Sequence, residues 1–235
     1  MKVRRNLSIL CQVIIGLLLA LSIQSCGIGV SEKEETVIQE ILDIYGGTCM
    51  MHKGKTTGTE GNKTYFELEI SGSPGLEAYK EYHPYMAGII AHQFYTGLAE
   101  ERKKYSHIKV TLRYEDGDWH KYEYSGQQIL EFVECIPTLK AIVEIARNSN
   151  YETLESHFVP EAFAPDAASP REAFLQMDSL YGASVDVDAI GFAPVESEFG
   201  EEMCYLVMEK RNRETVHFVI CIAREPQKAT TISWM

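Results

Sequence analysis

The feature that most constrains the fold is a change of hydrophobic period at Gly182. From residue 126 up to this glycine, apolar residues recur mainly at helical spacing. Beyond it, apolar and polar residues alternate with the period of two that is typical of strands. Strands are expected at about 184–195, 202–210, 215–224 and 230–234. Helices followed by an antiparallel meander of three or four strands indicate the α+β class, in which helices pack on one face of a sheet.

Three helical segments are expected before the meander. The first covers 126–148 and is interrupted by Pro137, because proline removes a backbone donor. The second covers 151–158. The third begins at Ser169-Pro170-Arg171-Glu172, which supplies an N-cap, a first-turn proline and a capping glutamate in order. Residues 125–235 are therefore predicted to form a C-terminal α+β region.

The preceding half repeats the mixture of helices and strands. Ser31 and Glu34 form a capping box that opens a helix ending at Gly46 and Gly47. A strand through Met51, a strand at 64–70, helical segments over 76–105 divided by Pro84, and a hairpin at 107–124 are then expected. In the hairpin, Asp116-Gly117 supplies the turn. Residues 31–124 are predicted to form an N-terminal α+β region.

The first 25 residues have the three parts of a secretory signal peptide. A basic start with Lys2, Arg4 and Arg5 precedes an apolar centre and a small-residue end. The unbroken apolar part, 13–22, is shorter than the roughly 20 residues that a membrane-spanning helix needs. Export with cleavage is therefore the prediction.

The residues Ile23-Gln24-Ser25-Cys26 follow the apolar part. They resemble the lipobox of bacterial lipoproteins, with Gln24 as the departure from the pattern. The resemblance implies lipidation of Cys26, a short tether over 26–30, and a membrane anchor of several acyl chains in the cell envelope, most simply the outer membrane. The alternative is ordinary cleavage after Ala20-Leu21-Ser22, which leaves Cys26 a plain thiol.

The run Ser31-Glu32-Lys33-Glu34-Glu35 is similar to the acidic surface-export signals found after the cysteine in lipoproteins of the Bacteroides group. It serves equally well as the charged first turn of a helix.

Composition restricts the partners. Removing residues 1–25 takes three of the 22 basic residues and none of the 34 acidic ones, which leaves a formal net charge of −15. Such an acidic surface does not suit nucleic acid or anionic headgroups. The expected partners are the membrane, through the anchor, and an unidentified protein or small ligand. The sequence leaves the oligomeric state open.

The order and lengths of the segments in 150–235 suggest a second resemblance. Asn150-Tyr151-Glu152-Thr153-Leu154 through Phe158, then the capped helix and the closing strands, resemble the cone-shaped nuclear-transport-factor-two-like superfamily. Enzymes of that superfamily use Asp, His and Tyr side chains that project into the cone. The candidates here are Asp178, Tyr181 and His217, and no motif assigns any of them a catalytic role. His217 is alternatively a core histidine bonded to backbone.

A disulfide is the sharpest local prediction. If Asn212 and Arg213 form the tip of a hairpin, Cys204 stands directly opposite Cys221, at a non-hydrogen-bonded position with Cα atoms about 4.5 Å apart. A disulfide tolerates that separation. A longer loop with the same register, or two free thiols in a buried strand, are the alternatives. Cys49 and Cys135 remain as a second pair by elimination, or as two separate buried thiols.

No other constellation carries a catalytic or metal signature. The seven histidines lack zinc-site spacing, and His107 and His120 fall on the outward phase of their hairpin. Asp116-Gly117-Asp118 is read as a turn, since no calcium-loop series continues from it. Asp186 and Asp188 share one strand face and are read as the solvated side of an edge strand, with acid–base work as the alternative.

The sequence thus predicts no catalytic residue, cofactor or metal ligand. The leading hypothesis is a non-catalytic envelope lipoprotein that binds a protein or small ligand. The alternative is a small-molecule hydrolase or isomerase of the cone-shaped class, which requires an enclosed pocket with convergent ionisable groups.

Overall fold

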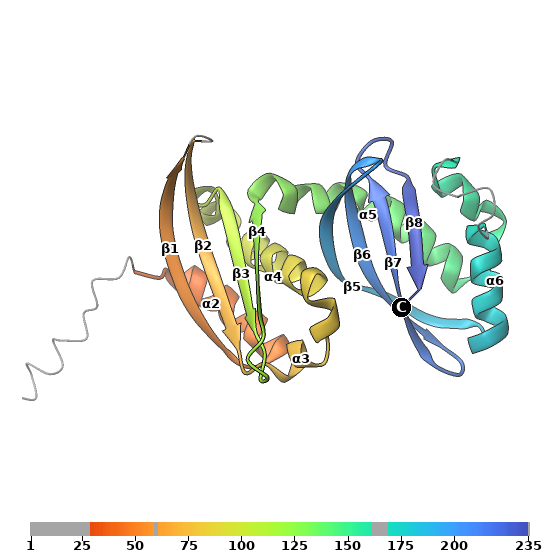
Figure 1. Cartoon of the computed structure of the whole chain (residues 1–235), viewed down its shortest axis with the longest axis horizontal. Helices are drawn as coiled ribbons and strands as arrows, with labels where there is room; N and C mark the ends of the chain where they lie inside the picture. Colours follow the sequence, from red (N-terminus) through yellow and green to blue (C-terminus); the bar gives the residue numbers. More distant parts are fainter. Residues whose placement is uncertain (1–28, 59–60, 161–168, 235) are drawn as a thin grey trace, which may run out of the picture. The chain divides into compact units, whose positions relative to one another are not determined.

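The protein has an α+β fold with two four-stranded sheets (Figure 1). The structure, a computed structural model, describes residues 29–58, 61–160 and 169–234. The expected leader 1–25, Cys26 and most of the tether lie outside these ranges. Compact packing groups the described residues from Lys33 onward into one unit. None of the helices in the described ranges is long and apolar enough to cross a membrane.

The first sheet has the order β1-β2-β3-β4 and is orange to green in Figure 1. Its outer pairs are antiparallel, but the central β2–β3 pair is parallel, which the sequence did not predict. A parallel pair needs a long crossover, and the helical residues between Ser71 and His107 provide it. The strands are β1 (Thr48–Gly58), β2 (Gly61–Ser71), β3 (His107–Arg113) and β4 (Trp119–Ser125).

Alternation on β2 and β3 builds the first core, as the sequence predicted. Phe66, Leu68 and Ile70 on β2, with Val110 and Leu112 on β3, are at most 1% exposed. They face the buried residues of helices α2 and α4. The helical elements of this half are α2 (Glu32–Tyr45), α3 (Pro74–Glu77), the 3-10 helices η1 (Lys80–Tyr82) and η2 (Ala99–Lys104), and α4 (His83–Gly97).

Helix α5 (Gly126–Arg147) is continuous, so the predicted interruption at Pro137 is wrong. Its N-terminus carries a capping box in which Ser125 and Gln128 bond each other's backbone N–H groups. Burial of Cys135 and Leu139 on either side of the proline holds the helix together despite the missing donor. Residues Tyr151–His157 form a 3-10 helix, η3, where an ordinary helix was expected.

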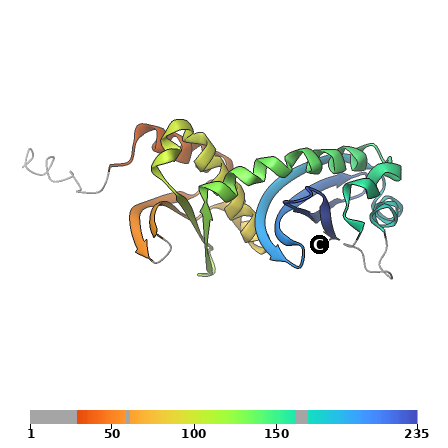
Figure 2. The same ribbon diagram turned by 90° about the horizontal axis from the view of Figure 1, so that it is seen from above.

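The second sheet is the predicted antiparallel meander, in the order β5-β6-β7-β8. Helix α6 (Pro170–Tyr181) precedes it, with the predicted capping box between Ser169 and Glu172. Figure 2 shows α5 alongside the curved strands of this sheet. The strands are β5 (Ser184–Ser197), β6 (Gly200–Arg211), β7 (Thr215–Ala223) and β8 (Ala229–Trp234).

Both faces of β6 are covered, so residues 202–207 are buried without a break. On one face, Tyr205 and Val207 join a core with α5, η3 and α6. On the other, Cys204 and Leu206 form a smaller cluster packed by Tyr82 and Tyr85. The two faces of the sheet therefore have different surroundings. Because alternate residues of β6 point to opposite faces, the position of a residue on β6 decides which surroundings its side chain meets.

Candidate functional site

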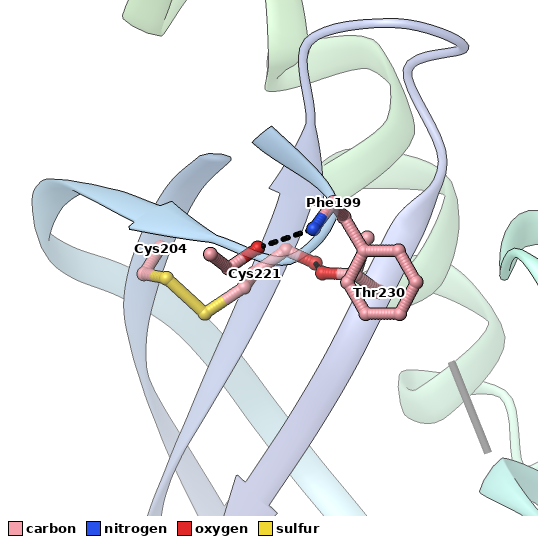
Figure 3. Close-up of a disulfide and its surroundings, with 5 residues drawn as sticks. Phe199, Cys204, Cys221 and Thr230 are labelled. Atoms are coloured by element: carbon pink, nitrogen blue, oxygen red, sulfur yellow. Dashed lines mark hydrogen bonds between the residues drawn. A yellow bond between two sulfur atoms is a disulfide. The ribbon is translucent and has the colours of Figure 1, made fainter. Parts of the chain in front are cut away.

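Cys204 and Cys221 lie directly opposite each other on β6 and β7, in the register that the sequence predicts. Their sulfur atoms are 2.04 Å apart and form a disulfide, and their Cα atoms are 3.9 Å apart (Figure 3). The backbone N–H of Arg211 donates to the carbonyl of Glu214, which closes the predicted turn at Asn212 and Arg213. Cys204 is 2% exposed and Cys221 is half-buried.

Cys49 and Cys135 do not form a disulfide in the structure. Cys49 is half-buried on the edge strand β1, and burial raises the pKa of its thiol to about 11. Cys135 is buried on α5, and burial likewise raises the pKa of its thiol. Both cysteines are thus poor nucleophiles at neutral pH, because the thiolate is the reactive form.

Of the three residues considered for the interior of the cone, Asp178 and Tyr181 lie on α6 and His217 lies on β7. His217 pairs with Met208, as predicted, and lies on the β6–β7 face that Tyr82 covers, with ring centroids 5.4 Å apart. Its Nε2 is buried without a hydrogen-bond partner. Asp178 belongs to the opposite face, where Tyr151 donates to it. Asp178 and His217 do not converge, because His217 and its partner Met208 share one face of the sheet, whereas Arg211, which contacts Asp178, lies on the other.

Asp178 instead belongs to a buried ionic network. The Arg211 guanidinium, whose side chain is fully buried, contacts Asp178 at 2.7 Å and Glu209 at 2.8 Å. These carboxylates raise the pKa of Arg211 against the opposing effect of its burial. The network is incomplete, since Glu209 Oε1 and Arg211 Nη2 have no hydrogen-bond partner. The charged groups of this network pair mainly with one another.

Aromatic side chains fill the space beside this network. Phe174 of α6 stacks on Tyr151 at a ring-centroid distance of 5.3 Å and meets the edges of Phe218 and Trp234. Phe174 and Phe218 are fully buried, and Tyr151 is 4% exposed. Among the described residues, the α6-facing side of the second sheet is thus packed with apolar rings.

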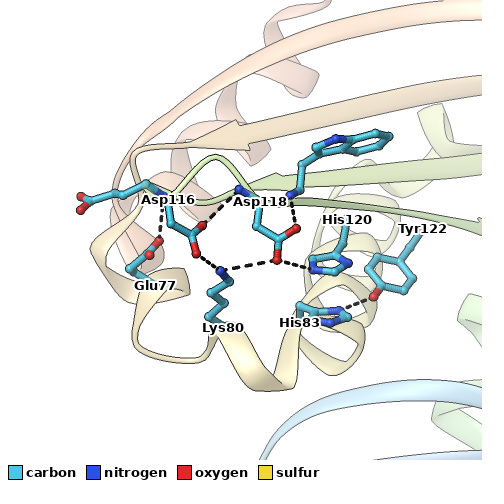
Figure 4. Close-up of polar contacts among 9 residues, drawn as sticks. Glu77, Lys80, His83, Asp116, Asp118, His120 and Tyr122 are labelled. Atoms are coloured by element: carbon cyan, nitrogen blue, oxygen red, sulfur yellow. Dashed lines mark hydrogen bonds and ion pairs between the residues drawn. The ribbon is translucent and has the colours of Figure 1, made fainter.

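A polar cluster that the sequence did not reveal joins η1 and α4 to the β3–β4 hairpin (Figure 4). Lys80 contacts both Asp116 and Asp118, and Asp118 lies 3.2 Å from Nε2 of His120. The predicted turn at 116–118 is present, with Gly117 at φ 90°. His120 was expected to be merely solvated, but its ring stacks on that of His83 at 3.7 Å.

The electrostatics of this cluster follow from its contacts. His83 Nδ1 hydrogen-bonds the hydroxyl of Tyr122. Burial, followed by the adjacent His120, lowers the pKa of His83, and burial raises that of Tyr122 to about 12. Lys80 lowers the pKa of Asp116, and the backbone N–H of Trp119 lowers that of Asp118. These groups satisfy one another and tie the hairpin to the helices.

Asp186 and Asp188 are exposed on the edge strand β5, in agreement with the solvated reading. Asp186 pairs with Arg147 of α5 at 3.2 Å. A register shift between Ser184 and Asp186 bends the strand at this point. Neither carboxylate is desolvated, so the pair lacks the environment that acid–base catalysis uses.

One group of possible metal ligands comes close enough together within the described residues, namely Glu202, Cys204 and Cys221. The two sulfur atoms are bonded to each other, so neither is a thiolate ligand. Glu202 is nevertheless unusual, because it is 5% exposed and its Oε1 has no hydrogen-bond partner. On the other face of β6, a cavity of about 130 Å³ lies between α5 and strands β5 and β6, and Glu131, Glu201 and Arg224 are among the residues that line it.

No protein-family model, curated protein or solved structure matches this chain. The assignment of a function therefore depends on the residues and geometry described above.

Proposed function

We propose that this chain is a lipid-anchored lipoprotein of the cell envelope whose folded part is a non-catalytic binding module for a protein or small ligand. The lipobox-like Ile23-Gln24-Ser25-Cys26 and the signal-like leader support the anchor. With Cys26 lipidated, the helix α2 begins only a few residues from the membrane surface, so the module acts close to it.

One observation favours a non-catalytic role over the enzyme alternative. The α6-facing side of the second sheet, where a cone-type enzyme would place its substrate, is packed by Tyr151, Phe174, Phe218 and Trp234. The ionisable groups beside these rings are engaged in the Arg211 network. An enzyme of the alternative class needs two or more ionisable groups that converge on an enclosed pocket, and the described residues on this side are arranged for packing instead.

The anchor is tested by metabolic labelling with a fatty-acid analogue in cells expressing the wild type, Cys26→Ala or Cys11→Ala. We expect label in the wild type and in Cys11→Ala, and none in Cys26→Ala. Cys11 is the matched control because it lies within the expected leader. Label retained by Cys26→Ala contradicts the proposal.

A protease-accessibility test on intact cells then assigns the face of the envelope. Digestion of the wild type without lysis places the module on the cell surface, and protection places it inside the envelope. Release of wild-type protein into buffer without detergent would overturn the anchor in either case, because several acyl chains hold a protein stably on a membrane.

A further inference from the structure

Glu202 is a buried carboxylate beside the disulfide. It lies two positions before Cys204 on β6, so both side chains point to the same face of the sheet. A carboxylate oxygen of Glu202 and the sulfur atoms of Cys204 and Cys221 all lie within 4.8 Å of one another. Glu202 is 5% exposed, and its Oε1 has no hydrogen-bond partner. A buried carboxylate normally has a cation or a hydrogen-bond donor beside it, and the sulfurs of a disulfide supply neither.

Reduction of the disulfide changes the chemistry beside this carboxylate. A dithiol reductant supplies two electrons and two protons, so the S–S bond breaks, both cysteines become thiols, and the reductant becomes a disulfide. Cys221 is the more exposed of the two cysteines, so we expect the reductant to attack its sulfur. A divalent metal ion that binds the two sulfurs releases both thiol protons to solvent. Two thiolates and the carboxylate of Glu202 are then available as ligands.

The strands hold these ligands together without the disulfide bond. Cys204 and Cys221 are register partners in a β6–β7 ladder whose pairing is regular from Glu202 to Lys210. The carbonyl of Cys221 accepts a hydrogen bond from Oγ1 of Thr230 at 3.1 Å. Because these backbone contacts do not involve the sulfur atoms, the two thiols should remain neighbours after reduction. Hydrogen bonds of this kind orient metal ligands in proteins.

The set of ligands favours a zinc ion. Zinc lies about 2.3 Å from sulfur and about 2.0–2.2 Å from carboxylate oxygen, so tetrahedral coordination places the ligand atoms about 3.5–3.8 Å apart. The three atoms within 4.8 Å of one another suit that spacing once the sulfurs separate. Thiolates select zinc over magnesium and calcium, which take oxygen ligands. No further His, Cys, Asp or Glu in the described part of the chain joins the group, which leaves the fourth position to water.

We propose that reduction of the Cys204–Cys221 disulfide creates a zinc site whose protein ligands are the two thiolates and the carboxylate of Glu202. In the oxidised protein the two sulfurs are bonded to each other, so the site does not form. The disulfide and the zinc site are therefore alternative states of the same residues. This inference goes beyond the proposed binding function and does not depend on the anchor at Cys26.

Zinc that binds only the reduced form shifts the thiol–disulfide equilibrium toward that form. At a free zinc concentration of about 100 times its Kd, the equilibrium constant should change about 100-fold, which is about 59 mV for a two-electron couple. Equilibration of the protein with dithiol and disulfide mixtures, with and without zinc, measures this shift. An equilibrium that zinc does not change overturns the proposal.

The direct test compares the two redox states of the intact protein in detergent. The protein is reduced with a dithiol, separated from it by gel filtration without oxygen, and titrated with zinc in competition with a chromophoric chelator. We expect one zinc ion per reduced chain and at least 100-fold weaker binding to the oxidised chain. Cys49→Ala should bind zinc within about three-fold of the wild type, because Cys49 lies outside the ligand group. Equal binding by the two redox states contradicts the proposed site.

The role of the carboxylate is tested in the reduced protein. Glu202→Gln keeps the size of the side chain and removes its charge, so we expect at least ten-fold weaker zinc binding. Glu201→Gln is the matched control, because Glu201 is the preceding residue of β6, points to the opposite face and pairs with Arg224. Its zinc affinity should stay within about three-fold of the wild type. Unchanged affinity of Glu202→Gln would remove Glu202 from the ligand set and overturn the proposal.

One measurement remains informative if Glu202→Gln does not fold. Cobalt(II) added to the reduced wild type should give thiolate-to-metal charge-transfer bands with the intensity of two thiolates, and visible bands with the intensity of a four-coordinate ion. The oxidised wild type should give neither. Bands of a six-coordinate ion, or a charge-transfer intensity below that of two thiolates, would contradict the proposed ligand set.

Discussion

At the scale of single residues, the disulfide has the clearest energetic consequence. Cys204 and Cys221 are separated by 17 residues and joined across β6 and β7. A crosslink over a loop of this length restricts the unfolded chain and contributes about 3 kcal/mol in the chain-entropy account. The hairpin already holds the two residues opposite each other, so little of the native geometry depends on the bond.

We therefore expect Cys204→Ala/Cys221→Ala to lower the free energy of unfolding by about 2–4 kcal/mol while keeping the fold. Denaturant titration followed by circular dichroism measures the change. A reductant should destabilise the wild type and leave the double variant unchanged. Cys49→Ala is the control, because that thiol is free. A wild type that is insensitive to reductant, with thiols that alkylate before reduction, would count against an oxidised pair in solution.

The second prediction at this scale concerns the effect of Arg211 on stability. Arg211→Met leaves Asp178 and the buried Glu209 without their cation, so we expect a loss of about 3–5 kcal/mol in the free energy of unfolding. The double variant Glu209→Leu/Arg211→Met should recover part of that loss, because it removes a buried charge together with its partner. Lys210→Ala, on the exposed phase of the same strand, should change stability by less than about 0.5 kcal/mol. Equal effects of Arg211→Met and Lys210→Ala would contradict the role of the network.

At the scale of elements, helix α4 is shared by the two halves of the fold. Its buried residues Ile90 and Phe94 belong to the core of the first sheet, whereas Ile89 packs against the cores of both sheets. The approach of α4 to β5 depends on two glycines. A Cβ at Gly88 would lie 1.9 Å from the carbonyl oxygen of Phe192, and one at Gly191 would lie 2.8 Å from the backbone of Tyr85.

We therefore expect Gly88→Ala to change the stability of the fold in the direction opposite to that of an ordinary glycine-to-alanine substitution in a helix. Replacing glycine by alanine inside a helix ordinarily stabilises by about 1 kcal/mol. Here the new methyl group meets backbone of β5, so we expect a destabilisation of about 1–3 kcal/mol or more, measured by thermal unfolding. A more stable Gly88→Ala would show that α4 does not pack on β5 as described.

At the scale of the whole molecule, two half-buried histidines make stability depend on pH. Burial lowers the pKa of both His83 and His92 from the ordinary value of 6.5. Around His83, the adjacent His120 and Lys80 lower the pKa further, and Asp118 opposes them. The folded state thus binds these two protons more weakly than the unfolded chain does.

We expect the contribution of these two neutral histidines to the free energy of unfolding to be fully present above about pH 6.5. It should be lost as the pH is lowered through their folded-state pKa values. His83→Asn/His92→Gln should flatten this dependence between about pH 7 and pH 5. His52→Gln, at an exposed position on the edge strand of the first sheet, is the matched control for removal of a histidine. Denaturant titrations at several pH values measure the slope, and equal slopes in wild type and the double variant would refute the assignment.

The sequence alone determined the features that depend on neighbouring residues. The alternation of 202–210 and 215–224, with a two-residue turn between them, determined which face each side chain takes and placed Cys204 opposite Cys221. The capping box of Ser169 and Glu172 determined where α6 begins. Turn chemistry, capping and periodicity act over a few residues, so they can be read without knowing the rest of the chain.

Only the tertiary structure decided which distant segments meet. The parallel β2–β3 pair, the continuity of α5 through Pro137, and the stacking of His83 on His120 have no local signal. The cavity between α5 and strands β5 and β6 is of the same kind, because segments far apart in the sequence must come together to line it. Packing energy between segments far apart in sequence decides these contacts, and it overrides local preference where the two disagree.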